Sequence, residues 1–425
     1  MLRTEVAEPL RIVLYGINHS PEPIGIGKYT GELAAWLASR GHKVKVVTAP
    51  PYYPQWRILS GYRRHWYSVD RRNGVDVLRC PLYVPATTGG PRRILHLASF
   101  AASSGPAVIY RAMRGADVVM TIAPTLLCAP LGLVAARLVG AKAWLHIQDF
   151  ELDIALNSFL SLGEQAQRIA LRLESTVLRR FDRVSAITPR MVDLVVKKGV
   201  AAERSVLLRN WVDTREIFPL SQPSPLRKEF SDAGLIALYS GNFGSKQGLE
   251  DLIEAARMLV ARQDIVFILC GDGAGRDGLL AQAKGLPNVQ VRDLLPAEQL
   301  NSLLNAADVH LLPQRAEYAD LVMPSKLLGI LASGRPVVAS ARTGTQLAAV
   351  AEACGLAIEP GRPAEIAQAV VRLADDPDLR GRLGAAAREY AVANLDRDGI
   401  LVAFERALYE VAGDRKFIGT IRGDR

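Results

Sequence analysis

The sequence predicts an α/β protein made of two doubly wound, parallel-sheet domains that face each other across a cleft. Three observations lead to this prediction. A chain of 425 residues is too long for one hydrophobic core. It opens with a strand, a glycine-rich loop and an amphipathic helix, and the same order restarts near residue 236. A segment rich in proline and serine separates the two runs, as is typical of a connection between domains.

The composition favours a globular protein, with 49% hydrophobic and 22% charged residues. The four cysteines are far apart and form no metal-binding or disulfide pattern, which fits a reducing cytosol. The first ten residues contain acids and lack an apolar core, so we predict no signal peptide. Residues 118–136 carry no charge, yet Pro124, Pro130 and Gly132 favour a strand, a turn and a helix over a transmembrane span.

The first domain is predicted over residues 1–212 and begins with a strand at residues 10–15. The helix at residues 29–39 has apolar side chains at helical spacing. The glycines after the strand, Gly25, Gly27 and Gly31, do not spell the dinucleotide-binding pattern, and no acid is placed to hold a ribose. We expect this loop to let a sugar or phosphate approach the backbone, with a plain tight turn as the alternative. Further strands are expected at residues 44–48, 118–122, 142–147, 183–187 and 205–208, and helices at residues 163–180 and from residue 189 onward.

Polar side chains gather at the end of the strand at residues 142–147. His146 and Gln148 lie on one face of that strand, and Asp149, Glu151 and Asp153 follow it. Ligands of open α/β sheets bind outside the carboxyl ends of the strands. The three acids could hold a metal, orient acceptor hydroxyls or cap the next helix. A metal is the least favoured role, because no second acid or histidine cluster completes a ligand set.

The net charge of +9 is unevenly distributed. Residues 57–93 contain eight arginines, among them Arg63 and Arg64, against Asp70 and Asp76, with aromatic residues interleaved. Nucleic acid and an anionic membrane surface are two partners for such a segment. A solvated basic loop is the third interpretation.

The second domain is predicted over residues 231–395, after a linker at residues 213–230. Residues 396–425 are expected to form a C-terminal helix and tail that could cross back to the first domain. The second domain repeats the strand, glycine loop and helix of the first. Its strands are expected at residues 236–239, 265–270, 289–291, 309–312 and 337–339, and its helices at residues 249–261 and 327–332, with several more between residues 364 and 413.

The stretch LVMPSKLLGILASGRPVVAS, residues 321–340, contains a helix-start signal. Pro324 suits the first helical position, and Ser325 and Lys326 place a hydroxyl and a cation beside unpaired backbone N–H groups. A helix N-terminus favours negative charge, so we hypothesise a diphosphate site here. An ordinary capped helix is the alternative.

Taken together, these segments resemble glycosyltransferase family 4, which has the GT-B fold of two Rossmann-like domains, and within it the colanic-acid-type exopolysaccharide glycosyltransferases. The resemblance covers roughly residues 10–400 in family order. It is carried by NHSPEPIGIGKYTGE, LHIQDFELD, SAITPRMVDLVVKKG, LLRNWVDTREIFP, YSGNFGSKQGLEDLIEAA, LVMPSKLLGILASGRPVVAS and GTQLAAV.

The resemblance implies a retaining enzyme that takes a nucleotide sugar, GDP- or UDP-linked, and needs neither a cofactor nor an essential metal. It implies donor binding mainly by the second domain and acceptor binding by the first. The expected catalytic residues are Asp149, His146, Lys246 and Lys326. The expected donor-binding residues are Gly25, Gly27, Gly241, Asn242, Gly271, Gly273, Leu294, Leu295, Ser325 and Lys326, and the expected acceptor-binding residues are Gln148, Glu151, Arg63 and Arg64.

The sequence departs from the family pattern in three places. The usual Gly-Arg and Lys-Gly pair has Asn242 and Gln247 at its Arg and Lys positions, with Lys246 one residue earlier. The family's two glutamates fall near Leu321 and on Gly329. The common His-Asp reads Gln148-Asp149. The subgroup whose stretch reads Pro-Ser-Lys shares these changes, so they do not indicate an inactive enzyme.

The sequence therefore predicts transfer of a sugar, with fucose or another hexose as candidates, to a growing polyprenyl-diphosphate-linked glycan. Preorganised cations would stabilise the charge that develops on the leaving group. The enzyme is expected in the cytoplasm, peripherally bound to the inner face of the membrane through residues 57–93, with no nucleic acid as partner. The alternatives are a nucleotide-sugar 2-epimerase on the same fold and a non-catalytic membrane- or nucleic-acid-binding protein.

Overall fold

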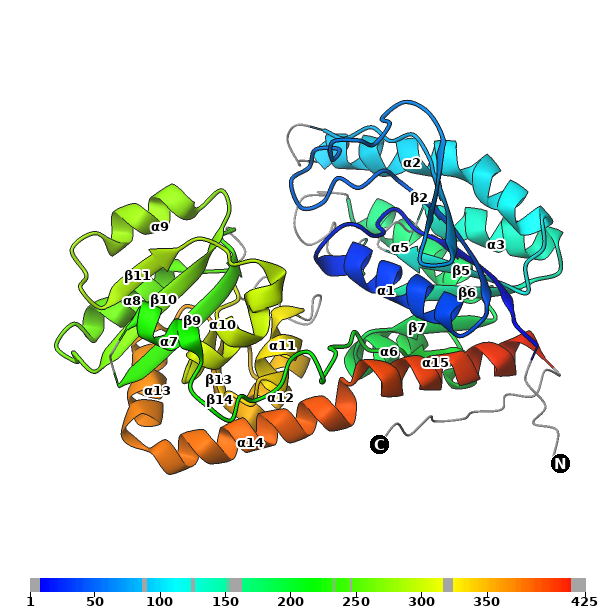
Figure 1. Ribbon diagram of the computed structural model, residues 1–425. Helices are drawn as coiled ribbons and strands as arrows, with labels where there is room; N and C mark the ends of the chain where they lie inside the picture. Colours follow the sequence, from blue (N-terminus) through cyan, green and yellow to red (C-terminus); the bar gives the residue numbers. More distant parts are fainter. Residues whose placement is uncertain are drawn as a thin grey trace, which may run out of the picture. The chain divides into compact units, whose positions relative to one another are not determined.

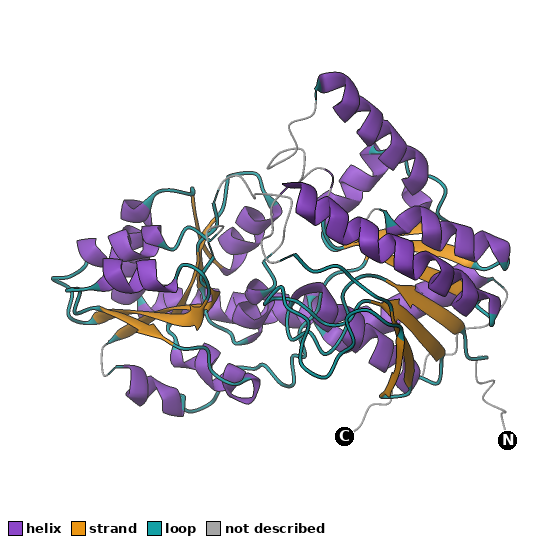
Figure 2. Cartoon of the chain, turned by 90° about the horizontal axis from the view of Figure 1, so that it is seen from above, coloured by secondary structure: helices purple, strands orange, loops and turns teal. Residues whose placement is uncertain are grey.

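The computed structural model describes residues 8–85, 90–123, 127–150, 152, 163–231, 234–244, 247–315 and 324–413. The chain forms two compact units, which are drawn in Figure 1. Unit 1 comprises Met1–Arg209 and Gly399–Arg425, and unit 2 comprises Asn210–Asp398. Figure 2 shows the strands of each unit with helices packed against them.

Unit 1 contains an eight-stranded sheet in the order β3-β4-β2-β1-β5-β6-β7-β8. Every neighbouring pair is parallel except β3 and β4, which form an antiparallel hairpin. The central strand β1 pairs with both β2 and β5, so the strand order reverses at its carboxyl end. Its strands are β1 (Arg11–Tyr15), β2 (Lys43–Thr48), β3 (Ser68–Arg72), β4 (Val75–Arg79), β5 (Val118–Ala123), β6 (Lys142–Ile147), β7 (Arg183–Ala186) and β8 (Ser205–Leu207).

Helices cover both faces of this sheet, because right-handed crossovers that run in opposite directions place their helices on opposite faces. The last helix of the chain also belongs to unit 1. It contributes Glu405, whose carboxylate lies 2.9 Å from the buried His42 ring nitrogen, and Phe404, which packs on the buried Trp144. The helices are α1 (Gly25–Ser39), α2 (Gly90–Met113), α3 (Cys128–Leu138), α5 (Glu164–Leu178), α6 (Pro189–Lys197), the short 3₁₀ helix η1 (Ala202–Arg204) and α15 (Arg397–Ala412).

Unit 2 contains a six-stranded, all-parallel sheet in the order β11-β10-β9-β12-β13-β14. The order reverses at β9, which pairs with both β10 and β12. Its strands are β9 (Leu235–Asn242), β10 (Ile265–Asp272), β11 (Val289–Arg292), β12 (Val309–Leu312), β13 (Val337–Ser340) and β14 (Gly355–Ile358). Its helices are α7 (Pro225–Phe230), α8 (Glu250–Met258), α9 (Arg276–Ala283), η2 (Ala297–Gln299), α10 (Leu300–Ala306), α11 (Lys326–Ala332), α12 (Gln346–Cys354), α13 (Pro363–Asp375) and α14 (Pro377–Asn394).

The fold differs from the sequence expectations at three places. Helix α1 begins at Gly25, four residues before the expected start, so Gly25 and Gly27 lie inside the helix and not in a loop before it. Residues 57–93, expected as one basic segment, include the β3–β4 hairpin and the start of α2. Residues 213–230 pack within unit 2, where the Asn305 side chain bonds the backbone of Phe218.

The uncharged stretch at residues 118–136 contains strand β5 and most of helix α3, as the sequence predicted. Among the helices of the described residues, none combines the length and the apolarity that a bilayer crossing requires. All four cysteines are buried free thiols.

Candidate functional site

The glycine loop of unit 2 follows the central strand at the point where the strand order reverses. Gly241 on β9 pairs with Gly271 on β10, and neither position can hold a side chain. A Cβ at Gly271 would lie 2.0 Å from the carbonyl oxygen of Gly241. Gly241 and Gly273 have φ values of 139° and 147°, which favour glycine. The two strand ends therefore present bare backbone, as a close-fitting ligand would require.

Lys326, the first residue of α11, lies against this bare backbone. A Cβ at Gly241 would come within 2.8 Å of the Lys326 Cε and Nζ atoms. The ammonium group donates to Tyr239 Oη at 2.5 Å and lies 4.0 Å from the centroid of that ring. Burial lowers the pKa of Lys326 to about 7. A bound anion would restore the charged form, so this lysine can respond to a ligand.

Tyr239 connects Lys326 to the glycine loop, a role that the sequence analysis missed. Its hydroxyl donates to the carbonyl oxygen of Asn242 at 2.7 Å while it accepts the bond from Lys326. Its ring is buried and stacks on Phe243 with a centroid separation of 6.1 Å. One phenol therefore fixes both the lysine and the turn after β9. The Ser325 side chain is exposed, as is that of Asn242, and Ser325 makes no capping bond to α11.

A pocket of about 550 Å³ opens beside the ends of β10 and β11. Leu295 lines it and packs against the core, whereas Leu294 is 53% exposed. Arg276 braces the pocket by donating to the Gly271 carbonyl at 2.9 Å and pairing with Asp293 at 2.6 Å. The other lining residues are Leu226, Glu229, Phe230, Cys270, Gln290, Val291, Arg292 and Gln299.

In unit 1, His146, which was expected to be catalytic, is buried in the sheet. His146 is 3% exposed, its Nδ1 atom is 2.9 Å from Ser185 Oγ, and its Nε2 atom is 3.0 Å from Gln148 Nε2. Burial lowers the pKa of His146 to about 3, so the ring is neutral. Asp149, which follows Gln148 in the sequence, is partly exposed. Burial raises the pKa of Tyr53, and the nearby Asp149 carboxylate adds to that rise.

The loop before α1 is held by a buried carboxylate. Glu22 accepts hydrogen bonds from Asn18 Nδ2 at 2.9 Å and from the backbone N–H groups of Tyr52 and Tyr53, each at 3.0 Å. A Cβ at Gly27 would lie 2.3 Å from a Glu22 carboxylate oxygen, so this glycine makes room for the acid. Burial raises the pKa of Glu22, although these bonds oppose the rise.

Two predicted residues, Lys246 and Glu151, lie outside the described residues. Arg63 and Arg64 are exposed in the loop before β3. Gly25 has a φ of 64°, and a Cβ there would contact only the ring of Tyr53, at 3.6 Å. The roles assigned to all these residues stay predictions. The structure brings Gly241, Gly271, Gly273 and Lys326 together in unit 2.

Two family models match the chain. Residues 25–211 match a glycosyl transferase 4-like domain, and residues 234–376 match the glycosyl transferases group 1. The chain is 38% identical to the putative colanic acid biosynthesis glycosyl transferase WcaI of Escherichia coli K12, covering 97% of this chain and all of that relative. It is 24% identical to the N-acetyl-alpha-D-glucosaminyl L-malate synthase of Bacillus anthracis, covering 94% and 98% of the two chains.

Solved structures have the same fold. Sucrose-phosphate synthase from Thermosynechococcus elongatus superposes with a TM-score of 0.71 at 20% identity, covering 93% of this chain and 98% of that one. Anabaena HepE in complex with UDP gives 0.67 at 18% identity, with 94% and 99% covered. The GT-B fold that the sequence predicted is confirmed, and the chain belongs to the glycosyltransferases with an N-terminal 4-like domain and a C-terminal group 1 domain.

Proposed function

We propose that the chain is a retaining hexosyltransferase that moves a sugar from a GDP- or UDP-linked donor to a polyprenyl-diphosphate-linked glycan in exopolysaccharide synthesis. The observation that carries the donor assignment is Lys326, which lies over Tyr239 beside the side-chain-free Gly241. A partly desolvated ammonium group next to bare backbone suits a diphosphate, because a charge-assisted bond there is worth about 1.5–3 kcal/mol.

The rest of the proposal is drawn from relatives. The relative from Escherichia coli is named for colanic acid biosynthesis, and the HepE structures hold UDP, glucose or UDP-glucose. Asp149, at the carboxyl end of β6, is the residue that we propose to face the acceptor hydroxyl. The pocket next to Leu295 has the size and mixed polarity to hold a nucleotide base. A lipid-linked acceptor would keep the enzyme at the cytoplasmic face of the membrane.

The test combines donor binding with transfer. Thermal unfolding is recorded against a panel of nucleotide sugars, where a ligand at 100 times its Kd adds roughly 2.7 kcal/mol to stability. The stabilising donor is then incubated with a polyprenyl-diphosphate-linked glycan, and the product anomer is read by NMR. Lys326→Met, which keeps the approximate length of the side chain but not its charge, should lose most of the stabilisation by the donor. Binding without transfer, or an epimerised nucleotide sugar without acceptor, would overturn the proposal.

A further inference from the structure

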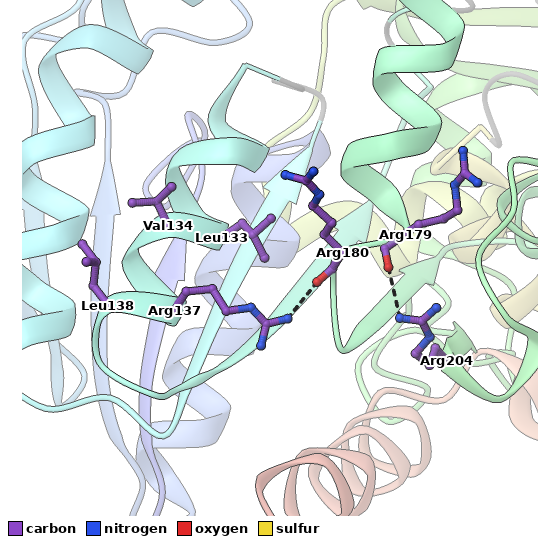
Figure 3. A pocket seen from close by; sticks show the side chains of 7 residues that line it. All are labelled: Leu133, Val134, Arg137, Leu138, Arg179, Arg180 and Arg204. Atoms are coloured by element: carbon purple, nitrogen blue, oxygen red, sulfur yellow. Dashed lines mark hydrogen bonds between the residues drawn. The ribbon is translucent and has the colours of Figure 1, made fainter.

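A pocket of about 620 Å³ on unit 1 is lined by cations and aliphatic side chains (Figure 3). It lies where α3 and α5 end, beside the first residues of β6 and β7, so it is at the opposite edge of the sheet from Asp149. We call it the arginine pocket. Its lining residues are Leu133, Val134, Arg137, Leu138, Arg179, Arg180 and Arg204.

The positive charges of the four guanidinium groups in this pocket are balanced by few acidic groups. Arg137 donates to the Arg180 carbonyl oxygen at 2.9 Å and lies 3.5 Å from Asp182. Arg204 donates to the Arg179 carbonyl oxygen at 3.1 Å. Arg204 also donates to the Phe181 carbonyl oxygen at 3.2 Å, and Arg179 donates to the Ser175 carbonyl oxygen at 3.0 Å. Arg137, Arg179 and Arg204 therefore keep further N–H donors, and the Arg180 side chain makes no bond to the described residues. The lining, which consists of described residues, includes no acidic side chain. An anion would complete the pocket.

Helix α3 also turns an apolar stripe toward solvent beside these arginines. Val134 is 47% exposed and Leu138 is 64% exposed, and Leu127, the residue before α3 and about two turns before Val134, extends the stripe at 48%. Residues 127, 131, 134 and 138 have the spacing of one helix face. A soluble anion such as free phosphate needs no such surface, whereas a phospholipid presents phosphate and hydrocarbon together.

The neighbouring helix α2 continues this surface. Residues 95, 102, 106 and 113 fall on one face of α2, and Leu95 and Met113, near its two ends, are 55% and 65% exposed. Between α2 and α3 lies a groove of about 520 Å³, into which Tyr110 also faces. Its remaining lining residues are Ala101, Ala102, Gly105, Pro106, Ile109, Met113 and Leu131. Apolar surface of this extent on two outer helices is typical of a binding face.

We propose that the outer face of α2 and α3, with the arginine pocket at its edge, binds the surface of an anionic phospholipid bilayer. The apolar stripes would enter the boundary between head groups and acyl chains, and the arginines would bind the lipid phosphates. Because α2 runs the length of the sheet, a bilayer lying along it reaches both the arginine pocket and the carboxyl edge near Asp149.

This inference deepens the membrane attachment in the proposed function and relocates it from residues 57–93. In that segment Arg79 is 1% exposed and donates to the carbonyl oxygens of Ala49 and Ser20. Arg72 pairs with Asp70 at 3.0 Å in the β3–β4 hairpin. These two arginines are therefore engaged within the protein.

The test is co-sedimentation of the full chain with vesicles of phosphatidylcholine alone, or of equal parts phosphatidylcholine and phosphatidylglycerol. Arg179→Gln with Arg180→Gln should weaken binding to the anionic vesicles by about 30-fold, and the matched pair Arg63→Gln with Arg64→Gln by much less. Replacing Arg179 and Arg180 by lysine should restore binding, because lysine keeps the charge.

A second variant tests the apolar contribution, since Val134→Gln with Leu138→Gln should weaken binding to anionic vesicles by about tenfold or more. Its matched control is Met258→Gln with Leu280→Gln, two exposed residues of unit 2. The inference would be overturned if neither Arg179→Gln with Arg180→Gln nor Val134→Gln with Leu138→Gln changed binding to the anionic vesicles. It would also be overturned if the chain formed a dimer in solution that the changes at residues 134 and 138 dissociate. If only Arg63→Gln with Arg64→Gln abolished binding to the vesicles, the membrane-binding surface would lie at residues 57–93 instead. Stabilisation by nucleotide sugar, measured on the same variants, reports separately on the proposed function and should not change.

Discussion

Replacing Tyr239 by phenylalanine separates the positioning of Lys326 from the packing of the site. The substitution deletes only the hydroxyl that accepts from Lys326 at 2.5 Å and donates to the Asn242 carbonyl at 2.7 Å. The ring, its stacking on Phe243 and its position 4.0 Å from the ammonium group remain. The variant should therefore fold normally and lose the alignment of the lysine.

The size of the effect follows from the two bonds. A hydrogen bond to a charged group contributes about 1.5–3 kcal/mol and a neutral one about 1 kcal/mol. Because the bond to the Asn242 carbonyl joins two neutral groups, the bond to Lys326 dominates. We expect kcat/KM for the donor to fall by about 10- to 100-fold, with a loss of folding stability of about 1–2 kcal/mol.

The assay is initial-rate transfer with the donor found in the thermal screen, at several donor concentrations. Tyr409→Phe is the control, because it removes a hydroxyl that donates to the Glu8 carbonyl at 3.2 Å in unit 1. That variant should keep its kcat/KM. If Tyr239→Phe transfers at the normal rate, the phenol does not position Lys326 for the donor.

Five further outcomes are expected. Donor affinity should fall as pH rises through about 7, where Lys326 loses its proton, and Lys326→Met should abolish this dependence. Because the folded pKa of this lysine lies below its ordinary value, the protein binds that proton less tightly than the unfolded chain, so the free energy of unfolding should rise between pH 7 and 10 relative to the Met variant. Gly271→Ala should abolish donor stabilisation in the thermal assay, since its Cβ would lie 2.0 Å from the Gly241 carbonyl oxygen. Glu405→Ala should lower the stability of unit 1 in urea by about 3 kcal/mol, because it leaves the buried His42 without its carboxylate. Transfer should continue at an unchanged rate after exhaustive treatment with EDTA, and a rate restored only by added Mg²⁺ or Mn²⁺ would contradict the expected metal independence.

The strands could be predicted because parallel strands buried on both faces are continuous apolar runs. Residues 265–270 were expected as a strand, and β10 extends two residues further, to Asp272. The β3–β4 hairpin was missed, although Asn73 and Gly74, with φ values of 50° and 75°, form the Asn-Gly turn that signals a hairpin. Because arginines are frequent around this turn, residues 57–93 were interpreted as one basic segment.

The site could be predicted only in part, because its decisive contacts join distant positions in the chain. Lys326 follows a helix-start signal and was assigned from local pattern. Tyr239 lies 87 residues earlier, within an apolar strand, where its pattern is that of a core residue. Glu22 likewise bonds the backbone 30 residues further along the chain. Sequence spacing shows which side chains share an element but not which elements meet.

The surroundings of Lys326 favour anion binding at this end of unit 2 over a role in fold stability alone. A lysine kept for stability would usually pair with a carboxylate, because burial of an unpaired ammonium is unfavourable. Among the described residues, no carboxylate lies within ion-pair distance of Lys326, and its near neighbours are a phenol and the Gly241 backbone. Burial lowers the pKa of Lys326, and a bound diphosphate would offset this effect. On the proposed function, such a diphosphate would gain negative charge as the sugar departs, so the interaction would strengthen toward the transition state and would lower the barrier to transfer.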